Sequence, residues 1–234
     1  MKKTLKTLAL LSAITVTLVS CNGSKQTASI PGISKGMVDS ASYAAGITMG
    51  NMIVSANLSD MNMTEFQKGL SDVINEKDLK IDMAMANQIL SQYMGAKENA
   101  VALENMEKGK AFLASNKENE GVIETESGLQ YIIIEEGNEV FPTADDTIEV
   151  HYKGTLIDGS QFDSSYDRGE PISLRLGDFI PGWVEGMQKI SEGGKIKLFI
   201  PSELAYGTQS AGSIKGGSVL IFEVELIKVT PQEN

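Results

Sequence analysis

Residues 147–162 read TIEVHYKGTLIDGSQF. From 148 to 153, apolar residues alternate with polar ones, and this period of two predicts a strand with one buried face. The pair Asp158 and Gly159 is typical of a tight turn between antiparallel strands. The stretch therefore predicts a β-hairpin, with His151, the chain's only histidine, on the solvent-facing side of its first strand.

Similar patterns surround this hairpin in the C-terminal half of the chain. Short strands are predicted at 131–134, 172–176, 195–200 and 219–229. A short helix is predicted within residues 180–187, IPGWVEGM, which contain the chain's single tryptophan, Trp183. Five or six strands with one short helix describe a compact α+β domain with a mostly antiparallel sheet.

The N-terminal half has the period of helices instead. The patterns predict helices over 39–57, from Thr64, where residues 64–67 read as a capping box, and over 82–115. A helix of that last length spans roughly 50 Å, more than two short neighbours can cover. Its apolar stripe is therefore expected to meet a second copy of the chain, and a solvated stalk with a narrow stripe is the alternative.

The first residues have the pattern of an export signal. Lys2, Lys3 and Lys6 precede an apolar run from about 8 to 19, which is shorter than the roughly 20 residues that cross a bilayer. LVSC at 18–21 resembles the bacterial lipobox, so residues 1–20 are expected to be cleaved and Cys21 to carry a lipid anchor. Residues 21–37 are rich in Gly and Ser and are expected to form a flexible tether.

Composition excludes several classes of function. The net charge of −11 becomes more negative once a leader with three lysines is removed, and such a chain is repelled by nucleic acid. With one histidine, and one cysteine expected to be lipidated, the chain offers no convincing metal site or activated nucleophile. Residues 191–195, SEGGK, lack the spacing of a phosphate loop.

What remains is a set of apolar and aromatic residues spread over strands, turns and the short helix. The segments that carry them are VHYKGTLIDGSQFDSSYDRGEP, IPGWVEGMQKISEGGKIKLFIPSELAYG and LIFEVELIKV. These segments, in this order over about 127–230, resemble the signature of the FKBP-type peptidyl-prolyl isomerases. The helical part before them is similar to the N-terminal dimerisation domain of the periplasmic macrophage infectivity potentiator class.

The resemblance implies an organisation and a fold. It implies a helical dimerisation domain and stalk over 38–119 and an isomerase domain over 120–234. The isomerase domain would be a twisted antiparallel sheet wrapped around a short helix, with a shallow apolar pocket between them. It also implies that X-Pro bonds rotate in this pocket without a nucleophile, metal or cofactor.

Roles of individual residues follow from the same resemblance. Trp183 would form the pocket floor under the substrate's proline ring. The Ile180 N–H and the Tyr206 hydroxyl would each bond a substrate carbonyl, and Asp163, held by Arg168, would form a polar rim. The residues expected to line or border the pocket are Tyr152, Phe162, Asp163, Arg168, Ile172, Phe179, Ile180, Trp183, Tyr206, Ile214 and Phe222.

Two positions depart from the family's pattern. Ile172 stands where the family often has an aromatic wall residue, and 215–217, Lys-Gly-Gly, replace a proline-containing turn. The second departure lies in a loop that overhangs the pocket. Ile172 would make the pocket looser, and the loop bears on sequence preference and on the binding of macrolide inhibitors, which the resemblance also implies.

Two functions from different classes therefore stand at this point. The first is a lipid-anchored, dimeric isomerase that acts on proline-containing unfolded or partly folded polypeptides in the bacterial envelope. Asn22, after Cys21, is not the aspartate that retains some lipoproteins in the inner membrane, which favours the outer membrane facing the periplasm. The second is a holdase chaperone, in which methionine-rich helices capture clients, or a module that binds proline-containing peptides; in either case the C-terminal pocket has weak or no isomerase activity.

Overall fold

The computed structural model describes residues 31–232. The expected leader, Cys21 and most of the expected tether lie outside the described residues. The chain divides into two compact units, with the boundary between Leu79 and Lys80. The division places the long third helix with the C-terminal sheet.

Within residues 31–79, the first unit contains two helices. α1 spans Lys35–Ser55, where Ser34 caps it by accepting from the Met37 N–H at 3.2 Å. α2 spans Met63–Ile74, and its cap is Asn62, whose side-chain oxygen accepts from the Thr64 and Glu65 N–H groups at 3.0 and 3.3 Å. The expected capping box beginning at Thr64 is therefore wrong, because an asparagine two residues earlier satisfies the free amides.

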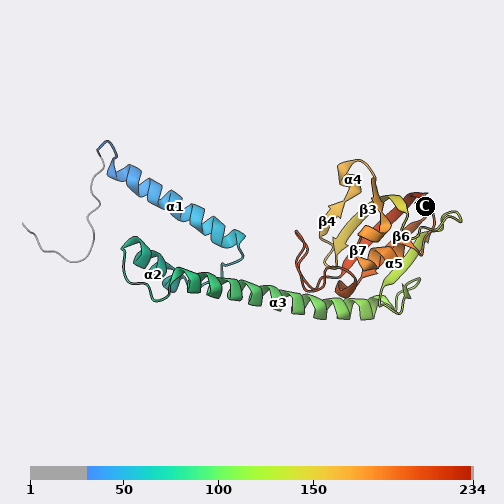
Figure 1. Ribbon diagram of the computed structural model, residues 1–234, viewed down its shortest axis with the longest axis horizontal. Helices are drawn as coiled ribbons and strands as arrows, with labels where there is room; N and C mark the ends of the chain where they lie inside the picture. The colour runs from blue at the N-terminus through green and yellow to red at the C-terminus, as the bar shows by residue number, and fades with distance from the viewer. Residues whose placement is uncertain (1–30, 233–234) are drawn as a thin grey trace, which may run out of the picture. The chain divides into compact units, whose positions relative to one another are not determined.

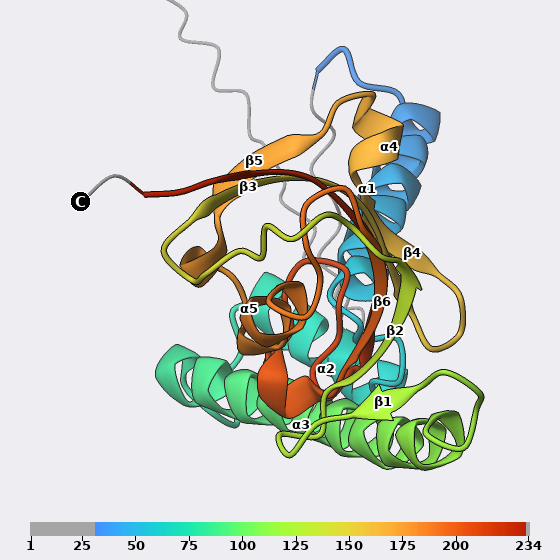
Figure 2. The same cartoon turned by 90° about the vertical axis from the view of Figure 1, so that its right-hand side faces the viewer.

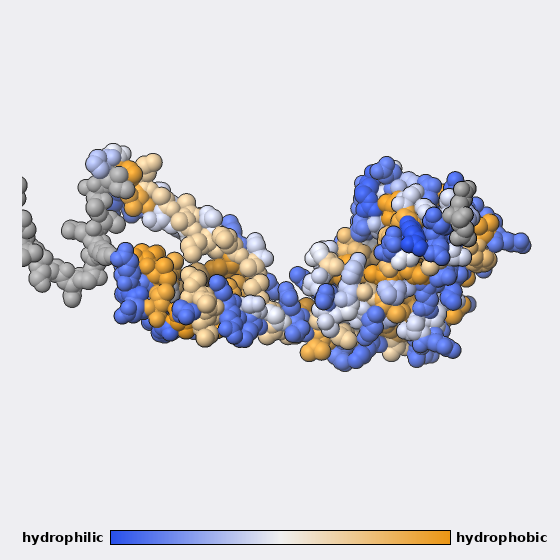
Figure 3. Space-filling view, viewed as in Figure 1, coloured by the Kyte–Doolittle hydropathy of each residue, from blue (hydrophilic) through white to orange (hydrophobic). Residues whose placement is uncertain are grey.

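Apolar side chains of the first unit are largely exposed. No residue of α1 is buried, and Figure 3 shows hydrophobic residues gathered over α1 and α2. Tyr43 is 75% exposed and Ile47 is 50% exposed. A helix face of this kind is unusual on the surface of a monomer.

The second unit begins with α3, which spans Met83–Asn116 and is capped by Asp82, in agreement with the expected helix. Its C-terminal half packs on the sheet that follows. Ala102 and Gly109 are buried, and Phe112 lies 6.1 Å from Phe199 between ring centres. The buried Asn116 amide donates to the Gln130 side chain at 2.9 Å. This half therefore has a cover that the sequence did not predict.

A seven-stranded antiparallel sheet follows α3, with the order β1-β2-β6-β7-β3-β4 and β5 also paired with β3. The strands are β1 Ile123–Glu124, β2 Gln130–Glu135, β3 Thr147–Leu156, β4 Gln161–Ser164, β5 Ile172–Arg175, β6 Lys195–Ile200 and β7 Leu220–Thr230. The short helices are α4 Ser165–Arg168, η1 Leu176–Asp178, α5 Pro181–Met187 and η2 Ser202–Leu204. The fold class predicted from the sequence is confirmed.

The sheet curves around α5, which lies on its concave side (Figures 1 and 2). Glycines allow this close approach, because a Cβ on Gly186 would lie 2.5 Å from Leu198 Cδ2 and one on Gly182 would overlap Ile200 Cγ2. The buried residues of the sheet and α5 form one apolar core. Some of these core residues also line the cavity described below.

The predicted hairpin is present between β3 and β4. The Leu156 N–H donates to the Ser160 carbonyl at 2.9 Å, and Gly159 adopts a positive φ of 83°. His151 is not fully solvated as expected, because its ring stacks on Tyr166 at 4.5 Å and its Nδ1 lies 3.0 Å from Ser165 Oγ. Its partners are thus structural ones.

None of the helices in residues 31–232 has the apolar length that a bilayer crossing requires. Over the same range, no group of three or more His, Cys, Asp or Glu side chains is placed to hold a metal ion.

Candidate functional site

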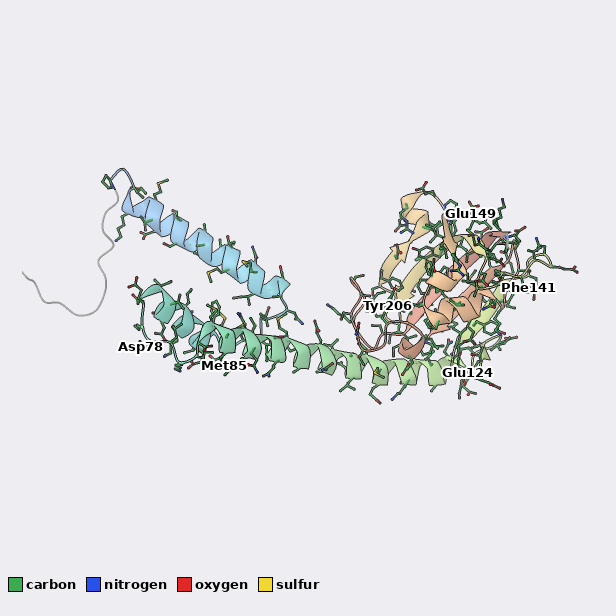
Figure 4. All side chains as sticks on the ribbon, in the orientation of Figure 1. Asp78, Met85, Glu124, Phe141, Glu149 and Tyr206 are labelled. Atoms are coloured by element: carbon green, nitrogen blue, oxygen red, sulfur yellow. The ribbon has the colours of Figure 1, made fainter. Side chains whose placement is uncertain are left out.

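A cavity of about 460 Å³ opens between α5, the sheet and the β6–β7 connection. Figure 4 labels Tyr206, one of its lining residues, in that connection. The lining residues come from strands, η1, α5 and loops: Tyr152, Phe162, Asp163, Asp178, Phe179, Ile180, Trp183, Tyr206, Ala211, Gly212, Ser213, Ile214 and Phe222. Most of the surface that lines it is therefore aromatic or aliphatic.

Trp183 is positioned by the start of α5. Pro181 occupies the first turn, where its fixed φ suits a helix start, and the Trp183 N–H donates to the Ile180 carbonyl at 2.9 Å. The side chain is 1% exposed, and within the described residues its Nε1 has no hydrogen-bond partner. The indole is thus held by packing on the cavity's inner side.

Aromatic rings fix the indole from several sides. Tyr152 and Phe222 meet it edge to face, with ring centres 5.7 and 5.3 Å away, and Phe179 lies 5.2 Å away. Edge-to-face pairs of this kind are favourable because the positive edge of one ring meets the negative face of the other. The cluster therefore presents a rigid apolar surface to the cavity.

One wall depends on a glycine in β3. Phe162 and Phe222 pack edge to face at 5.4 Å beside Gly154, and a Cβ there would lie 2.5 Å from Phe162 Cε2. A side chain at this position would push Phe162 out of the wall. The absence of a Cβ thus permits the wall to form.

A polar group borders the same wall. The Tyr152 hydroxyl donates to Asp163, Arg168 Nη1 donates to Asp163 Oδ1 at 2.5 Å, and Arg168 Nη2 donates to the Tyr152 oxygen at 2.8 Å. Arg168 also lies 5.4 Å from the centre of the Tyr152 ring. The three side chains thus hold one another in a closed triangle.

Hydrogen bonds within this triangle shift the pKa values of Asp163 and Tyr152. Burial by itself would raise the pKa of Asp163, but the hydrogen bonds from Tyr152 and Arg168 outweigh it and hold that pKa below its ordinary value. Burial, followed by the hydrogen bond to Asp163, raises the pKa of Tyr152. The stabilisation from Asp163 is therefore present above its ordinary pKa and is lost only as the pH falls through its lowered value.

The structure brings together nine of the eleven expected pocket residues. The other two are Arg168, which contacts the cavity only through Tyr152 and Asp163, and Ile172. Ile172 pairs with Val150 in the sheet and packs against the core instead of lining the cavity. The expectation that Ile172 is a wall residue is not supported by its position.

Four lining residues were not anticipated: Asp178, Ala211, Gly212 and Ser213. Ala211 and Ile214 pair backbone to backbone at 2.9 and 3.0 Å, which closes a tight turn over the cavity. The Gly and Ser content of the loop signals a turn, but nothing local says where that turn points. For Asp178, the only sequence signal of a place at the cavity is that it directly precedes Phe179, an expected pocket residue.

The C-terminal domain is thus an antiparallel sheet curved around a short helix, with an aromatic cavity between them (Figure 2). The sequence-family model for the FKBP-type peptidyl-prolyl cis-trans isomerase matches residues 138–227. A second family model, for the domain amino terminal to FKBP-type peptidyl-prolyl isomerase, matches residues 38–133. The N-terminal and C-terminal parts of the chain thus match the two domains of the same kind of isomerase.

Individual relatives agree with this match. The isomerase FkpA of Aeromonas hydrophila is 37% identical, covering 98% of this chain and 96% of its own. Outer membrane protein MIP of Legionella longbeachae is 36% identical, covering 82% of this chain and 85% of its own. The crystal structure of FkpA from Escherichia coli superposes with a TM-score of 0.70 at 36% identity, covering 85% of this chain and 98% of that one.

The chain belongs to the FKBP-type peptidyl-prolyl cis-trans isomerases. It is an enzyme that interconverts the cis and trans forms of X-Pro bonds. The family favours this function over the holdase alternative.

Proposed function

We propose that the cavity over Trp183 is the catalytic site and that its lining residues act as follows. The substrate's proline ring rests on the indole, with Tyr152, Phe162 and Phe222 as walls. The Ile180 N–H and the Tyr206 hydroxyl donate to substrate carbonyls. The observation that supports this assignment most directly is the rigid edge-to-face packing of Tyr152 and Phe222 on Trp183.

The proposed chemistry needs no covalent step. The barrier to X-Pro rotation is about 20 kcal/mol, because twisting removes the amide resonance. A twisted amide has a less polar carbonyl and a pyramidal nitrogen, so an apolar cavity favours it over the planar form. The hydrogen bonds from the Ile180 N–H and the Tyr206 hydroxyl would hold the substrate carbonyls in position while the C–N bond rotates.

Arg168 offers a test of the polar triangle. Arg168→Met removes two hydrogen bonds that hold Asp163 and Tyr152, and we expect kcat/KM for a short Leu-Pro peptide to fall about fivefold. The pKa of Asp163 should rise toward its ordinary value, because a lowering contact is lost. Peptide isomerisation rates and a carboxylate NMR titration, with the chain from Ser24, measure the two effects.

The matched control is Lys197→Met, because Lys197 pairs with Glu223 at 2.8 Å and neither residue lines the cavity. Its rate should equal that of the unaltered chain. Equal loss in both variants would contradict the role given to Arg168. No acceleration by the unaltered chain would contradict the proposed site as a whole.

We also propose that the chain is a homodimer joined through its N-terminal helices. The exposed apolar side chains of α1 support this, because a partner would remove them from water. The chain from Ser24 should sediment at micromolar concentration with twice the mass of one chain. Ile47→Glu should shift it to monomer, since a charge would enter the apolar face.

Phe141→Glu is the control for this experiment. Phe141 is 55% exposed, like Ile47, but it lies in the C-terminal unit between β2 and β3 (Figure 4). This variant should remain a dimer. A monomeric mass for the unaltered chain, or dissociation by both variants, would count against an interface on α1.

We propose further that Cys21 is lipidated and anchors the enzyme in the bacterial envelope, in the outer membrane facing the periplasm. The leader pattern supports the anchor, and the similarity to a relative named outer membrane protein supports the membrane. There the enzyme would act on unfolded proline-containing polypeptides, whose folding X-Pro isomerisation slows. The same cavity would take macrolide inhibitors.

Incorporation of a labelled fatty acid, abolished by Cys21→Ser, tests the anchor. Ser24→Ala, a change near the cysteine but outside the LVSC stretch, should retain the label. Label that persists in Cys21→Ser would place the lipid elsewhere or exclude it from this residue.

A further inference from the structure

One face of α3 lies against the loop that overhangs the cavity. Ala102, Asn105, Met106 and Gly109 recur at spacings of three and four, so they share one side of the helix. Asn105 Nδ2 donates to the Gly216 carbonyl at 2.9 Å, across 111 residues of sequence. The helix and the loop are thus joined by a specific bond as well as by packing.

The two glycines of the loop match this contact. A Cβ on Gly217 would overlap the Ala102 carbonyl oxygen and lie 3.0 Å from Met106 Cγ. Gly217 also adopts a positive φ of 75°, and a Cβ on Gly216 would lie 3.2 Å from Ala102 Cβ. The two glycines of the Lys-Gly-Gly sequence at 215–217 therefore let α3 approach the loop.

The helix carries a matching glycine. A Cβ on Gly109 would lie 2.7 Å from Val219 Cγ2, just beyond the loop. Gly109 and Val219 are both buried. Three glycines on the two sides of one contact thus bring the backbones of α3 and the loop together.

The loop transmits this contact to the cavity through backbone bonds. The Gly217 N–H donates to the Gly207 carbonyl at 2.8 Å, and Gly207 directly follows Tyr206. Within the loop that this hydrogen bond closes, Ala211 and Ile214 pair with each other and line the cavity. A shift at Gly216 would therefore move the residues that cover the proposed substrate site.

We propose that α3 supports the active-site loop of residues 207–217 and that Asn105 is a positioning residue for isomerisation. Asn105 holds Gly216 through its hydrogen bond. The hydrogen bond between Gly217 and Gly207 then stays formed, and Tyr206 and Ile214 keep their positions at the cavity. The proposal rests on the site described above, because it assigns a consequence for catalysis to those two residues. It makes the long helix part of the isomerase unit as well as a link to the N-terminal helices.

The test compares Asn105→Ala and Asn105→Asp with Lys110→Ala in the chain from Ser24. Asp keeps the size of Asn but lacks the N–H donor, and Ala favours a helix more than Asn does, so α3 should stay folded. Lys110 lies on the same helix with a 66% exposed side chain, and its ammonium group pairs with Glu107 at 3.4 Å. It therefore controls for a change on the helix surface.

Hydrogen exchange and kinetics give independent readouts. Amide exchange at Gly217 and Ile214 should become about three- to tenfold faster in both Asn105 variants, while the β6 and β7 amides keep their rates. KM for a Leu-Pro peptide should rise about threefold with little change in kcat, because the loop covers bound substrate. Lys110→Ala should change none of these values.

Unchanged exchange at Gly217 and Ile214 would overturn the proposal. So would faster exchange with unchanged KM, since the loop would then be held without consequence for the substrate. An unaltered chain without isomerase activity would instead refute the proposed site, while the exchange rates would still decide whether Asn105 holds the loop. The two failures are therefore distinguishable.

Discussion

Trp183→Leu should lower kcat/KM for a Leu-Pro peptide by about 100-fold, which corresponds to about 3 kcal/mol of lost transition-state stabilisation. The indole supplies the inner surface of the cavity and contacts three other rings that border it. Leucine is smaller and branched, so the proline ring would lose its flat support and water would enter. Isomerisation rates of the peptide, with and without enzyme, measure the effect.

A loss of folding must be separated from this loss of activity. Truncating a residue that is 1% exposed leaves a void, and we expect about 2–3 kcal/mol lower free energy of unfolding. Met187→Leu is the matched control, because Met187 is fully buried in the same helix but lies outside the cavity lining. It conserves volume and should keep nearly full activity.

Full activity in folded Trp183→Leu would contradict the assignment of the cavity as the catalytic site. Suppression of client aggregation offers a second readout for the same variants. Its survival in the inactive variant would locate client binding outside the pocket.

Gly182→Ala should lower the free energy of unfolding of the C-terminal unit by about 3 kcal/mol. The added methyl would overlap Ile200 Cγ2, and Ile200 is fully buried in β6 with no room to withdraw. Relief requires α5 to move away from the sheet, and Trp183 would move with it. Urea unfolding followed by the fluorescence of this single tryptophan measures the change.

Gly95→Ala is the control for Gly182→Ala. Gly95 also lies within a helix, but a Cβ there would meet nothing within 4 Å. Alanine loses less backbone entropy on folding than glycine does, so this variant should be as stable as the unaltered chain or up to about 1 kcal/mol more stable. Equal destabilisation in both variants would show that overlap with Ile200 is not the cause.

Local patterns predicted much of the C-terminal domain. Alternation identified the main strands, and Asp158 with Gly159 identified the hairpin turn, because these signals depend only on neighbouring residues. The start of α2 was placed wrongly, since Asn62 competes with Thr64 for the same free amides. The two-residue strand β1 was missed, because a pair this short has no period to detect.

The sequence by itself determined the elements, the family and nine residues that line the cavity, because alternation and motif order are properties of the chain. Only the tertiary structure decided that Ile172 faces the core, that Asp178 and residues 211–213 reach the cavity, and that α3 packs on the active-site loop. The physical reason is that a period records which face of an element is apolar but not what covers that face. Covering partners such as Asn105 and Gly216 lie 111 residues apart, and folding alone brings them together.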